Sequence, residues 1–319
     1  MDHEDIDDGD VFIYRGGRAP RHVTHVLIDK SVDEIEDYAF EDCPKLLQVD
    51  THNGLRKIGE QAFGWCKSLR CINLKSAIEI DQRAFYYCDK LESVEFGDKL
   101  EIIGTSAFGY CPLRHLKVPS IITIGEGAFD CAKLIDIEFS EQLETIGARS
   151  FRYCKRLQRI VIPMKRNLFS LCDIFQRYNQ FDECEQLATV DLVGGILTTI
   201  ASLHMESWRT EMIAEINSIN QVLPNTPVNK KSGAIQRWME IVLDKMDHYK
   251  AQHCSYVWEG TALLELALWK NKLGEIAEYA EEGKPKKAKV VSESYRKDKR
   301  ITCGADMVIK NVLPFLQLE

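Results

Sequence analysis

The most regular pattern in the sequence is a set of apolar positions that returns about every 22 residues. Each copy has an Ile, then an Ala-Phe or Ser-Phe pair, then a Cys. The six clear copies span 35–43, 58–66, 80–88, 103–111, 124–131 and 146–154, and a shorter copy spans 181–184. One such unit is too small to bury its own apolar side. Self-similarity at a fixed period therefore predicts stacked coils that share one core.

A second apolar phrase follows each Cys and predicts a β-strand. Its last three positions alternate apolar, polar and apolar, as in Ile72, Asn73 and Leu74, which is typical of a strand with one buried face. Strands of this kind are predicted from 23–28 to 187–192. A third apolar column lies eight positions before each Phe. A Gly follows the repeat Ile in four copies and is expected to permit a turn there: Gly59, Gly104, Gly125 and Gly147.

The combined phrase I-G-x-x-A-F-x-x-C…L-x-x-I-x-L resembles the BspA-type leucine-rich repeat over residues 23–192. The resemblance implies an α/β repeat solenoid, a right-handed superhelix with a concave sheet, that serves protein recognition. It implies no catalytic residues, because the family pattern contains none. Together with the carboxyl-terminal third, the repeats also resemble a group of diatom repeat proteins. Extra residues interrupt the pattern after Pro163, so the last coil is expected to be distorted or to act as a cap.

The residues between the apolar strand positions are predicted to line the concave face, since successive side chains in a strand alternate. Two outward columns result: His25, Gln48, Cys71, Ser93, His115, Asp136, Arg159 and Thr189, and beside them Leu27, Asp50, Asn73, Glu95, Lys117, Glu138, Val161 and Asp191. The candidate partner-binding residues are Asp50, Asn73, Glu95, His115, Lys117, Asp136, Glu138, Arg159 and Asp191.

The mildly acidic balance of these columns favours a basic or mixed-charge protein segment as the partner. The alternative is a solvated face that only keeps the repeats soluble. Aromatic residues, which anchor many interfaces, lie instead beside the Cys column, where packing is favoured over binding: Trp65, Tyr86, Tyr87, Tyr110 and Tyr153.

Past Leu192 the apolar spacing changes to three and four, which is typical of amphipathic helices. Helices are predicted at about 199–223 and 232–249. A third, around 263–269, is apolar on nearly all sides and is expected at the centre of a small bundle. The stretch 307–318 is expected to pack back onto it. The basic segment 281–300 is interpreted as a loop, with a two-part nuclear import signal as the alternative.

The predicted organisation is an acidic N-terminal tail and cap (1–22), a leucine-rich-repeat solenoid (23–198) and an all-α C-terminal module (199–319). The helical module either covers the open end of the solenoid or forms a separate binding or dimerising bundle. The first alternative would hide an exposed strand edge and the end of the core.

Charge and composition indicate whether binding to nucleic acid, association with a membrane or secretion is expected. The chain has 319 residues and a formal net charge of −8, so no nucleic-acid partner is expected. Its longest uncharged apolar stretch, about 192–203, is shorter than the ~20 residues of a membrane span, and no membrane association is predicted. The acidic first ten residues are unlike a secretory signal.

Seven of the eleven cysteines follow the repeat: Cys43, Cys66, Cys88, Cys111, Cys131, Cys154 and Cys184. We expect them to be small buried thiols, because free Cys is among the most buried residue types and zinc ligands have shorter local spacings. An odd number of cysteines and the acidic N-terminus predict an intracellular, cytoplasmic protein, with the nucleus as an alternative.

The sequence contains no P-loop, metalloprotease or dinucleotide-binding motif, and neither a cofactor nor a metal is predicted. The predicted function is a non-catalytic protein–protein interaction scaffold that binds a partner on the concave sheet. Two alternatives remain open: a regulatory or enzymatic helical module that the repeats dock, and cell-surface adhesion. The partner and the oligomeric state do not follow from the sequence.

Overall fold

The computed structural model describes residues 11–130, 132–169, 179–203 and 205–281. The chain forms two compact units. One contains the residues up to Thr198 together with Glu211–Leu243, and the other contains Thr199–Thr210 and the residues from Asp244 onward. Cys131, most of the segment inserted after Pro163, the basic segment after residue 281 and the stretch 307–318 lie outside the described residues.

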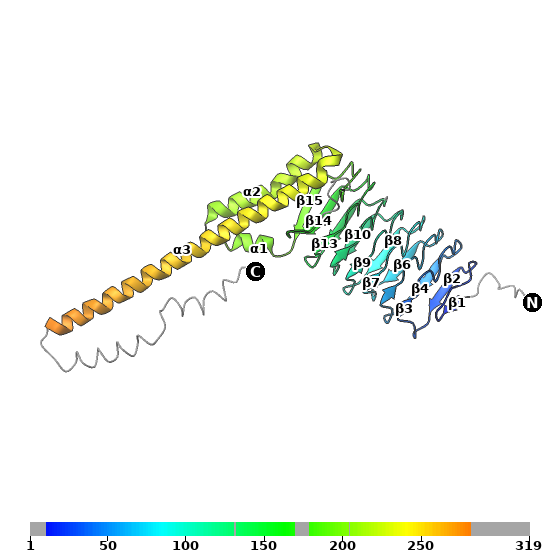
Figure 1. The fold of residues 1–319 in the computed structure, drawn as a ribbon, viewed down its shortest axis with the longest axis horizontal. Coiled ribbons are helices and arrows are strands. Elements are labelled where there is room, and N and C mark those ends of the chain that lie inside the picture. The colour runs from blue at the N-terminus through cyan, green and yellow to red at the C-terminus, as the bar shows by residue number, and fades with distance from the viewer. Residues whose placement is uncertain (1–10, 131, 170–178, 204, 282–319) are drawn as a thin grey trace, which may run out of the picture. The chain divides into compact units, whose positions relative to one another are not determined.

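The first unit is a solenoid in which each coil contributes one longer strand to a broad wall (Figure 1). These strands are β1 (Val11–Tyr14), β2 (His25–Ile28), β4 (Gln48–Asp50), β6 (Cys71–Leu74), β8 (Ser93–Phe96), β10 (His115–Val118), β12 (Asp136–Phe139), β14 (Arg159–Pro163) and β15 (Thr189–Val193). They pair in parallel in the orders β1-β2-β4, β6-β8 and β10-β12-β14-β15. The predicted repeat solenoid is confirmed, and β1 adds a strand within the segment assigned to the N-terminal tail.

A second, narrow parallel sheet runs along another wall, where the sequence predicts no strand. Its two-residue strands are β3 (Glu34–Ile35), β5 (Lys57–Ile58), β7 (Glu79–Ile80), β9 (Ile102–Ile103), β11 (Thr123–Ile124) and β13 (Thr145–Ile146). The second residue of each strand is the buried repeat Ile. Two residues are too few for the alternation that identifies a strand in a sequence.

The core contains a continuous stack of Phe rings, one from each coil. Neighbouring rings have centroids 5.0–5.8 Å apart and lie within 8° of parallel. The stack consists of Phe40, Phe63, Phe85, Phe108, Phe129, Phe151 and Phe181, all fully buried. Tyr14 of β1 extends it, with its ring 4.9 Å from that of Phe40. The strand β1 therefore closes the first coil over the end of the core.

The repeated cysteines connect each coil to the one before it. The Sγ of Cys66 donates to the backbone carbonyl of Phe40 at 3.1 Å, and Cys88 and Cys111 make the same contact with Phe63 and Phe85. These thiols are fully buried. Burial raises the pKa of the Cys66 and Cys88 thiols. It also raises the pKa of Cys43 to about 11 and that of Cys184 to about 12. The prediction of buried free thiols holds for the repeat cysteines among the described residues.

The glycines after the repeat Ile have a different role from the one expected. Gly59, Gly104, Gly125 and Gly147 do not have a positive φ. An added Cβ at each would lie 2.6 or 2.7 Å from a backbone atom of the preceding coil. Because these glycines have no side chain, one coil can approach the next closely. The turn itself does not require a glycine.

The turns instead use non-glycine residues in the left-handed region, two in most coils. One lies two positions before the repeat Phe, as Gln61 does (φ 50°), and one precedes the Cys, as Trp65 does (φ 59°). With this backbone conformation, every second amide of the turn points along the solenoid axis. The amide of Trp65 consequently donates to the carbonyl of Tyr86 in the next coil, at 2.8 Å. The hydrogen bonds of these amides to the next coil compensate for the energetic cost of the left-handed backbone conformation.

The carboxyl-terminal region consists of α1 (Ile196–Ala201), α2 (Glu206–Val222), two short 3-10 turns (Leu223–Asn225 and Val228–Lys230) and α3 (Lys231–Glu281). The helices predicted at 232–249 and 263–269 are thus one helix. No proline separates them, and a single glycine, Gly260, costs a helix only about 1 kcal/mol. The expectation that 263–269 lies inside a bundle is wrong, because Leu263, Leu264, Leu266 and Leu268 are 62–67% exposed.

Within the first unit, helical residues contact the last coil. The buried ammonium group of Lys231 donates to the carbonyls of Cys184, Glu185 and Leu187 at 3.2, 2.9 and 2.6 Å. The Phe181 amide donates to Ser232 Oγ at 3.1 Å. In the middle of the solenoid the equivalent amide pairs with the next coil, as the Phe63 amide does with the Ala84 carbonyl at 2.7 Å. In the last coil the Ser232 hydroxyl takes the place of that carbonyl.

Candidate functional site

The strand register brings the predicted outward residues together into two columns. Residues of the first column pair directly across neighbouring strands, with His115 opposite Asp136 and Asp136 opposite Arg159. In the second column Asn73 lies opposite Glu95, and Lys117 lies opposite Glu138. We call this surface, the outward side of β1 to β15 in the broad wall, the open sheet face.

Polar and charged side chains of the open sheet face pair between adjacent strands or coils. His115 Nδ1 lies 2.5 Å from Asp136 Oδ2, and Arg159 Nε lies 2.6 Å from Asp191 Oδ2. Two lysines complete the set: Lys117 with Glu138 at 3.1 Å and Lys75 with Glu95 at 2.8 Å. All four pairs are substantially exposed, so each contributes only about 0–1 kcal/mol to stability.

The remaining candidate residues have neutral neighbours. The Gln48 side-chain amide donates to Asp50 Oδ1 at 2.8 Å, and Asn73 Oδ1 accepts from the Lys75 backbone amide at 3.0 Å. Val161, which is also expected on this face, lies opposite Glu138 and Asp191 as predicted, but it is only 6% exposed and so is not available as a surface residue. The sequence predicts the order of the outward residues, and the structure adds that their charges are matched from one strand to the next.

One end of the open sheet face is apolar, a feature that does not follow from the repeat pattern. Val11 and Ile13 of β1 pair with His25 and Leu27 of β2 and extend the two columns by one strand. Val11, Ile13 and Leu27 are 53%, 45% and 42% exposed. The uninterrupted run of β-branched and aromatic residues over 11–14 is a signal that could have identified this strand. We call these three residues the apolar end.

Four of the five aromatic residues beside the Cys column form a second stack, on the turn wall of the solenoid, and the fifth, Tyr153, is 45% exposed. Tyr87 stacks on Tyr110 at a centroid distance of 4.3 Å and on Trp65 at 6.3 Å, and Tyr86 meets Tyr87 edge-on at 4.7 Å. These side chains are half-buried. Their mutual contacts support the packing role that the sequence favours.

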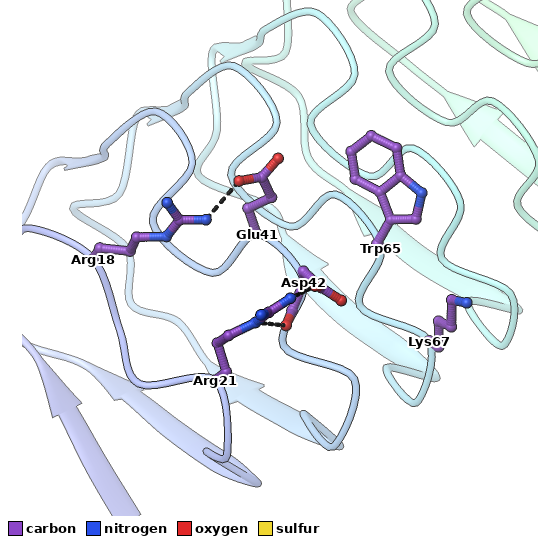
Figure 2. A pocket seen from close by; sticks show the side chains of 6 residues that line it. All are labelled: Arg18, Arg21, Glu41, Asp42, Trp65 and Lys67. Carbon is purple, nitrogen blue, oxygen red and sulfur yellow. Dashed lines mark hydrogen bonds and ion pairs between the residues drawn. The ribbon is translucent and has the colours of Figure 1, made fainter.

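A shallow pocket of about 580 Å³ lies on the turn wall near the first coil (Figure 2). Arg18 donates to Glu41 at 2.6 Å, and Arg21 forms an ion pair with Asp42. Trp65 and Lys67 also line the pocket. Because carboxylates of the first coil already hold both guanidinium groups, the pairs attach the segment before β2 to that coil and leave neither Arg as an unpaired anion-binding group.

The described residues contain no group of three or more His, Cys, Asp or Glu side chains placed to hold a metal ion. No helix in the described part of the chain is long and apolar enough to span a membrane. The open sheet face is a surface of parallel strands with an apolar end and paired polar side chains. Its chemistry suits the binding of a chain segment or a protein surface.

The family model for the BspA type leucine rich repeat region matches residues 20–130 and 72–179, in six copies. No curated protein matches the chain. Among solved structures, the chain is similar to a leucine-rich repeat protein from Bacteroides ovatus, with 22% identity, a TM-score of 0.44 and coverage of 55% of this chain and 48% of that chain. This chain thus spans about half the length of that protein.

Two further solved structures are similar over the repeats. The T. pallidum leucine-rich repeat protein has 22% identity and a TM-score of 0.43, with coverage of 65% of this chain and 87% of that chain. The pneumococcal vaccine antigen PcpA has 20% identity and a TM-score of 0.39, with coverage of 53% and 50%.

Proposed function

Because the chain belongs to the BspA-type leucine-rich-repeat family, as its matched repeats show, we propose that it is a protein-interaction scaffold that binds a partner protein on the open sheet face. A non-catalytic role is part of this proposal. The observation that carries it is the apolar end, where Val11, Ile13 and Leu27 remain exposed beside one another on a regular sheet. Burying such side chains is the main favourable term in most protein associations.

The matched charges supply the second part of the proposed interface. The side-chain pairs at Glu95, Asp136, Glu138 and Asp191 are exposed and individually weak. A partner that brings its own basic groups can therefore replace Lys75 or Lys117 at little cost. The apolar end would then supply affinity, and the charges would orient the partner and accelerate association.

Capture experiments with matched variants test this proposal. The immobilised full chain is compared with a charge variant, Glu95→Lys with Glu138→Lys, and an apolar-end variant, Ile13→Lys with Leu27→Lys. The control is Glu101→Lys with Glu144→Lys, which makes the same charge change at exposed positions just before the narrow-sheet strands β9 and β13. Captured proteins are quantified by mass spectrometry, and folding is checked by circular dichroism.

A specific partner should be captured equally by the wild type and the control. The amount of this partner captured by each open-sheet-face variant should fall at least fivefold, since loss of an interface anchor or reversal of a matched charge at the interface is expected to cost more than about 1 kcal/mol. If every protein captured by the wild type is retained equally by both face variants, the open sheet face is not the binding surface.

We infer a covering role for helical residues 211–243, which supports one of the two roles predicted for the helical module. The support comes from Lys231, Ser232 and Asn220, which satisfy polar backbone groups of the last coil. Such covering protects a strand edge from pairing with other chains. The substitution Lys231→Met should therefore increase aggregation on mild heating, as measured by light scattering, whereas Lys230→Met at the exposed neighbouring position should not.

We also propose an intracellular, reducing location, which the buried free thiols support. The competing candidate is cell-surface adhesion, since one similar structure is described as a leucine rich cell surface protein. Thiol titration of unfolded protein, isolated from its native source without reductant, separates the two. Eleven reactive thiols agree with the reducing location, and substantially fewer contradict it.

A further inference from the structure

The first strand of the broad wall has an edge without a partner strand. β1 is the terminal strand of its sheet, and among the described residues it pairs only with β2 (Figure 1). A free edge is a row of backbone amides and carbonyls that can pair with another chain. At the opposite end of the broad wall, Asn220 Oδ1 accepts the Val190 amide of β15 at 2.8 Å, so that edge is partly covered.

The hydrogen bonds of β1 show which of its groups face the free edge. The Asp29 amide donates to the Tyr14 carbonyl at 3.0 Å. Because successive residues of a strand direct their backbone groups to opposite sides, Phe12 and Tyr14 bond towards β2. Val11 and Ile13 therefore direct their amides and carbonyls to the free edge. The side chains of these same two residues are 53% and 45% exposed on the open sheet face.

The residues before β1 are poorly suited to fill this edge. Asp and Glu, which are depleted in strands, occupy six of the first ten positions: Asp2, Glu4, Asp5, Asp7, Asp8 and Asp10. A strand of such residues would place carboxylates against the apolar side chains of Val11 and Ile13, where desolvation of a charge is costly. A second copy of β1 has a β-branched or aromatic residue at every position and fits the edge better.

The charges on the two sides of β1 are opposite in sign. The segment 2–10 has six carboxylates and no Lys or Arg, whereas the segment 15–22 has Arg15, Arg18 and Arg21 and no Asp or Glu. These three arginine side chains are 60–71% exposed. An antiparallel pair of β1 strands directs the acidic side of each copy towards the basic side of the other, so the match forms twice. A parallel pair would bring like charges together.

We propose that the free edge of β1 is a homodimer interface, in which two copies pair as antiparallel strands about a two-fold axis. Val11 of each copy lies opposite Ile13 of the other, and Phe12 lies opposite its own equivalent. Since Val11 and Ile13 both direct their backbone groups to the edge, each such pair exchanges two hydrogen bonds. A two-fold interface uses the same patch on both copies, and an antiparallel strand at the edge of a parallel sheet is common.

This arrangement doubles the open sheet face. A two-fold axis perpendicular to the sheet keeps the two faces on the same side, so they form one continuous surface. The apolar end of each copy then lies at the centre of the doubled face, with the paired polar side chains on both sides. Edge pairing leaves the apolar side chains on the open sheet face, where a partner protein can still contact them. The dimer does not itself require such a partner.

Sedimentation equilibrium of the full chain between 1 and 200 μM tests the dimer. The mass should rise with concentration from 36.6 kDa towards twice that value. Ile13→Pro removes an amide that faces only the free edge, a position where a strand tolerates proline, and it should raise the dissociation constant at least 20-fold. The matched control, Ile13→Val, keeps the amide and should stay within threefold of the wild type. Circular dichroism confirms that each variant folds.

A cross-link tests the register. Residues of a pair without hydrogen bonds have Cα atoms about 4.5 Å apart, which suits a disulfide. Under mild oxidation, Phe12→Cys should therefore form a disulfide between position 12 of the two copies, as identified by peptide mapping. The wild type, in which Cys71 and Cys254 are exposed, is the control for disulfides of the native cysteines.

Three results would overturn the proposal. They are a wild type that is monomeric at 200 μM, whichever segment covers its edge, a dimer that survives Ile13→Pro, and a dimer in which Phe12→Cys gives no disulfide at position 12. Partner capture is scored separately. A monomeric wild type that still loses its partner through Ile13→Lys with Leu27→Lys would refute the dimer and leave the proposed binding surface intact.

Discussion

The substitution Phe108→Ala tests whether the Phe stack supports the solenoid. Phe108 is fully buried at the middle of the stack. Its ring lies parallel to Phe85 at 5.1 Å and to Phe129 at 5.7 Å, and it meets Phe96 edge-on at 5.8 Å. Alanine removes all three ring contacts and leaves a void between two coils, because rings stacked on both sides limit collapse into the space.

The expected loss follows from these contacts. Phe→Ala in a well-packed core costs about 3–5 kcal/mol, and each aromatic pair contributes about 0.5–1.5 kcal/mol beyond its area. Three pairs and poor collapse place the expected loss near the upper end, about 4–5 kcal/mol. Phe108→Leu keeps most of the volume and should cost about 1–2 kcal/mol. Leu47→Ala, at a residue that is 47% exposed, should cost less than about 0.5 kcal/mol.

Urea unfolding followed by far-ultraviolet circular dichroism and by tryptophan fluorescence measures these losses. Coincidence of the two probes tests whether the coils unfold together, because stacked repeats couple mainly to their neighbours. A loss below about 1 kcal/mol for Phe108→Ala, or a loss equal to that of Leu47→Ala, would refute the central stack as the source of stability.

Three further predictions concern the coil contacts. Gly125→Ala should cost about 1–3 kcal/mol in urea unfolding, because the added Cβ would lie 2.6 Å from the carbonyl carbon of Gly104, whereas Gly233→Ala meets nothing within 4 Å and should not destabilise. Burial lowers the pKa of Lys231, so the unfolded chain holds this proton more tightly. The free energy of unfolding should therefore rise with pH between the folded-state pKa of Lys231 and 10.5. A Lys231→Met variant should lack that rise, and it should be about 1–3 kcal/mol less stable at neutral pH because the Lys231 hydrogen bonds are lost. In the native protein at pH 8, an alkylating reagent should modify Cys71 and Cys254, which are exposed. It should leave Cys88 unmodified, because burial raises the pKa of that thiol and blocks access of the reagent. Peptide mapping that finds Cys88 labelled first would contradict the buried contact.

The sequence predicts the features of the solenoid that depend on side-chain alternation. Ile72, Asn73 and Leu74 are sufficient to identify a strand and its two faces, and the fixed repeat length then places His115 beside Asp136. The narrow sheet has only two residues in each strand and leaves no periodic signal. The left-handed conformation of Trp65 is equally hidden, because hydrogen bonds to the next coil stabilise it and its own side chain does not favour it.

Two failures of prediction concern residues whose neighbours come from elsewhere in the fold. Ile13 falls in the segment predicted as a tail, although the run of β-branched and aromatic residues over 11–14 indicates a strand, and this strand adds to the candidate site. Leu264 and Leu266 have the composition of a buried helix, yet they are exposed in the described chain. A pattern reports which side chains are apolar, but it does not identify what covers them.

The thiol-to-carbonyl contact between coils has an evolutionary consequence. Each Cys reaches only the coil immediately before it, so duplication or loss of one whole repeat leaves every other contact of this kind intact. A partial repeat would leave one carbonyl without its thiol and one Phe ring without its neighbour. The gene can therefore lengthen or shorten the scaffold in whole coils, and with it the reach of the surface that it presents, while the ends remain closed by Tyr14 and Lys231.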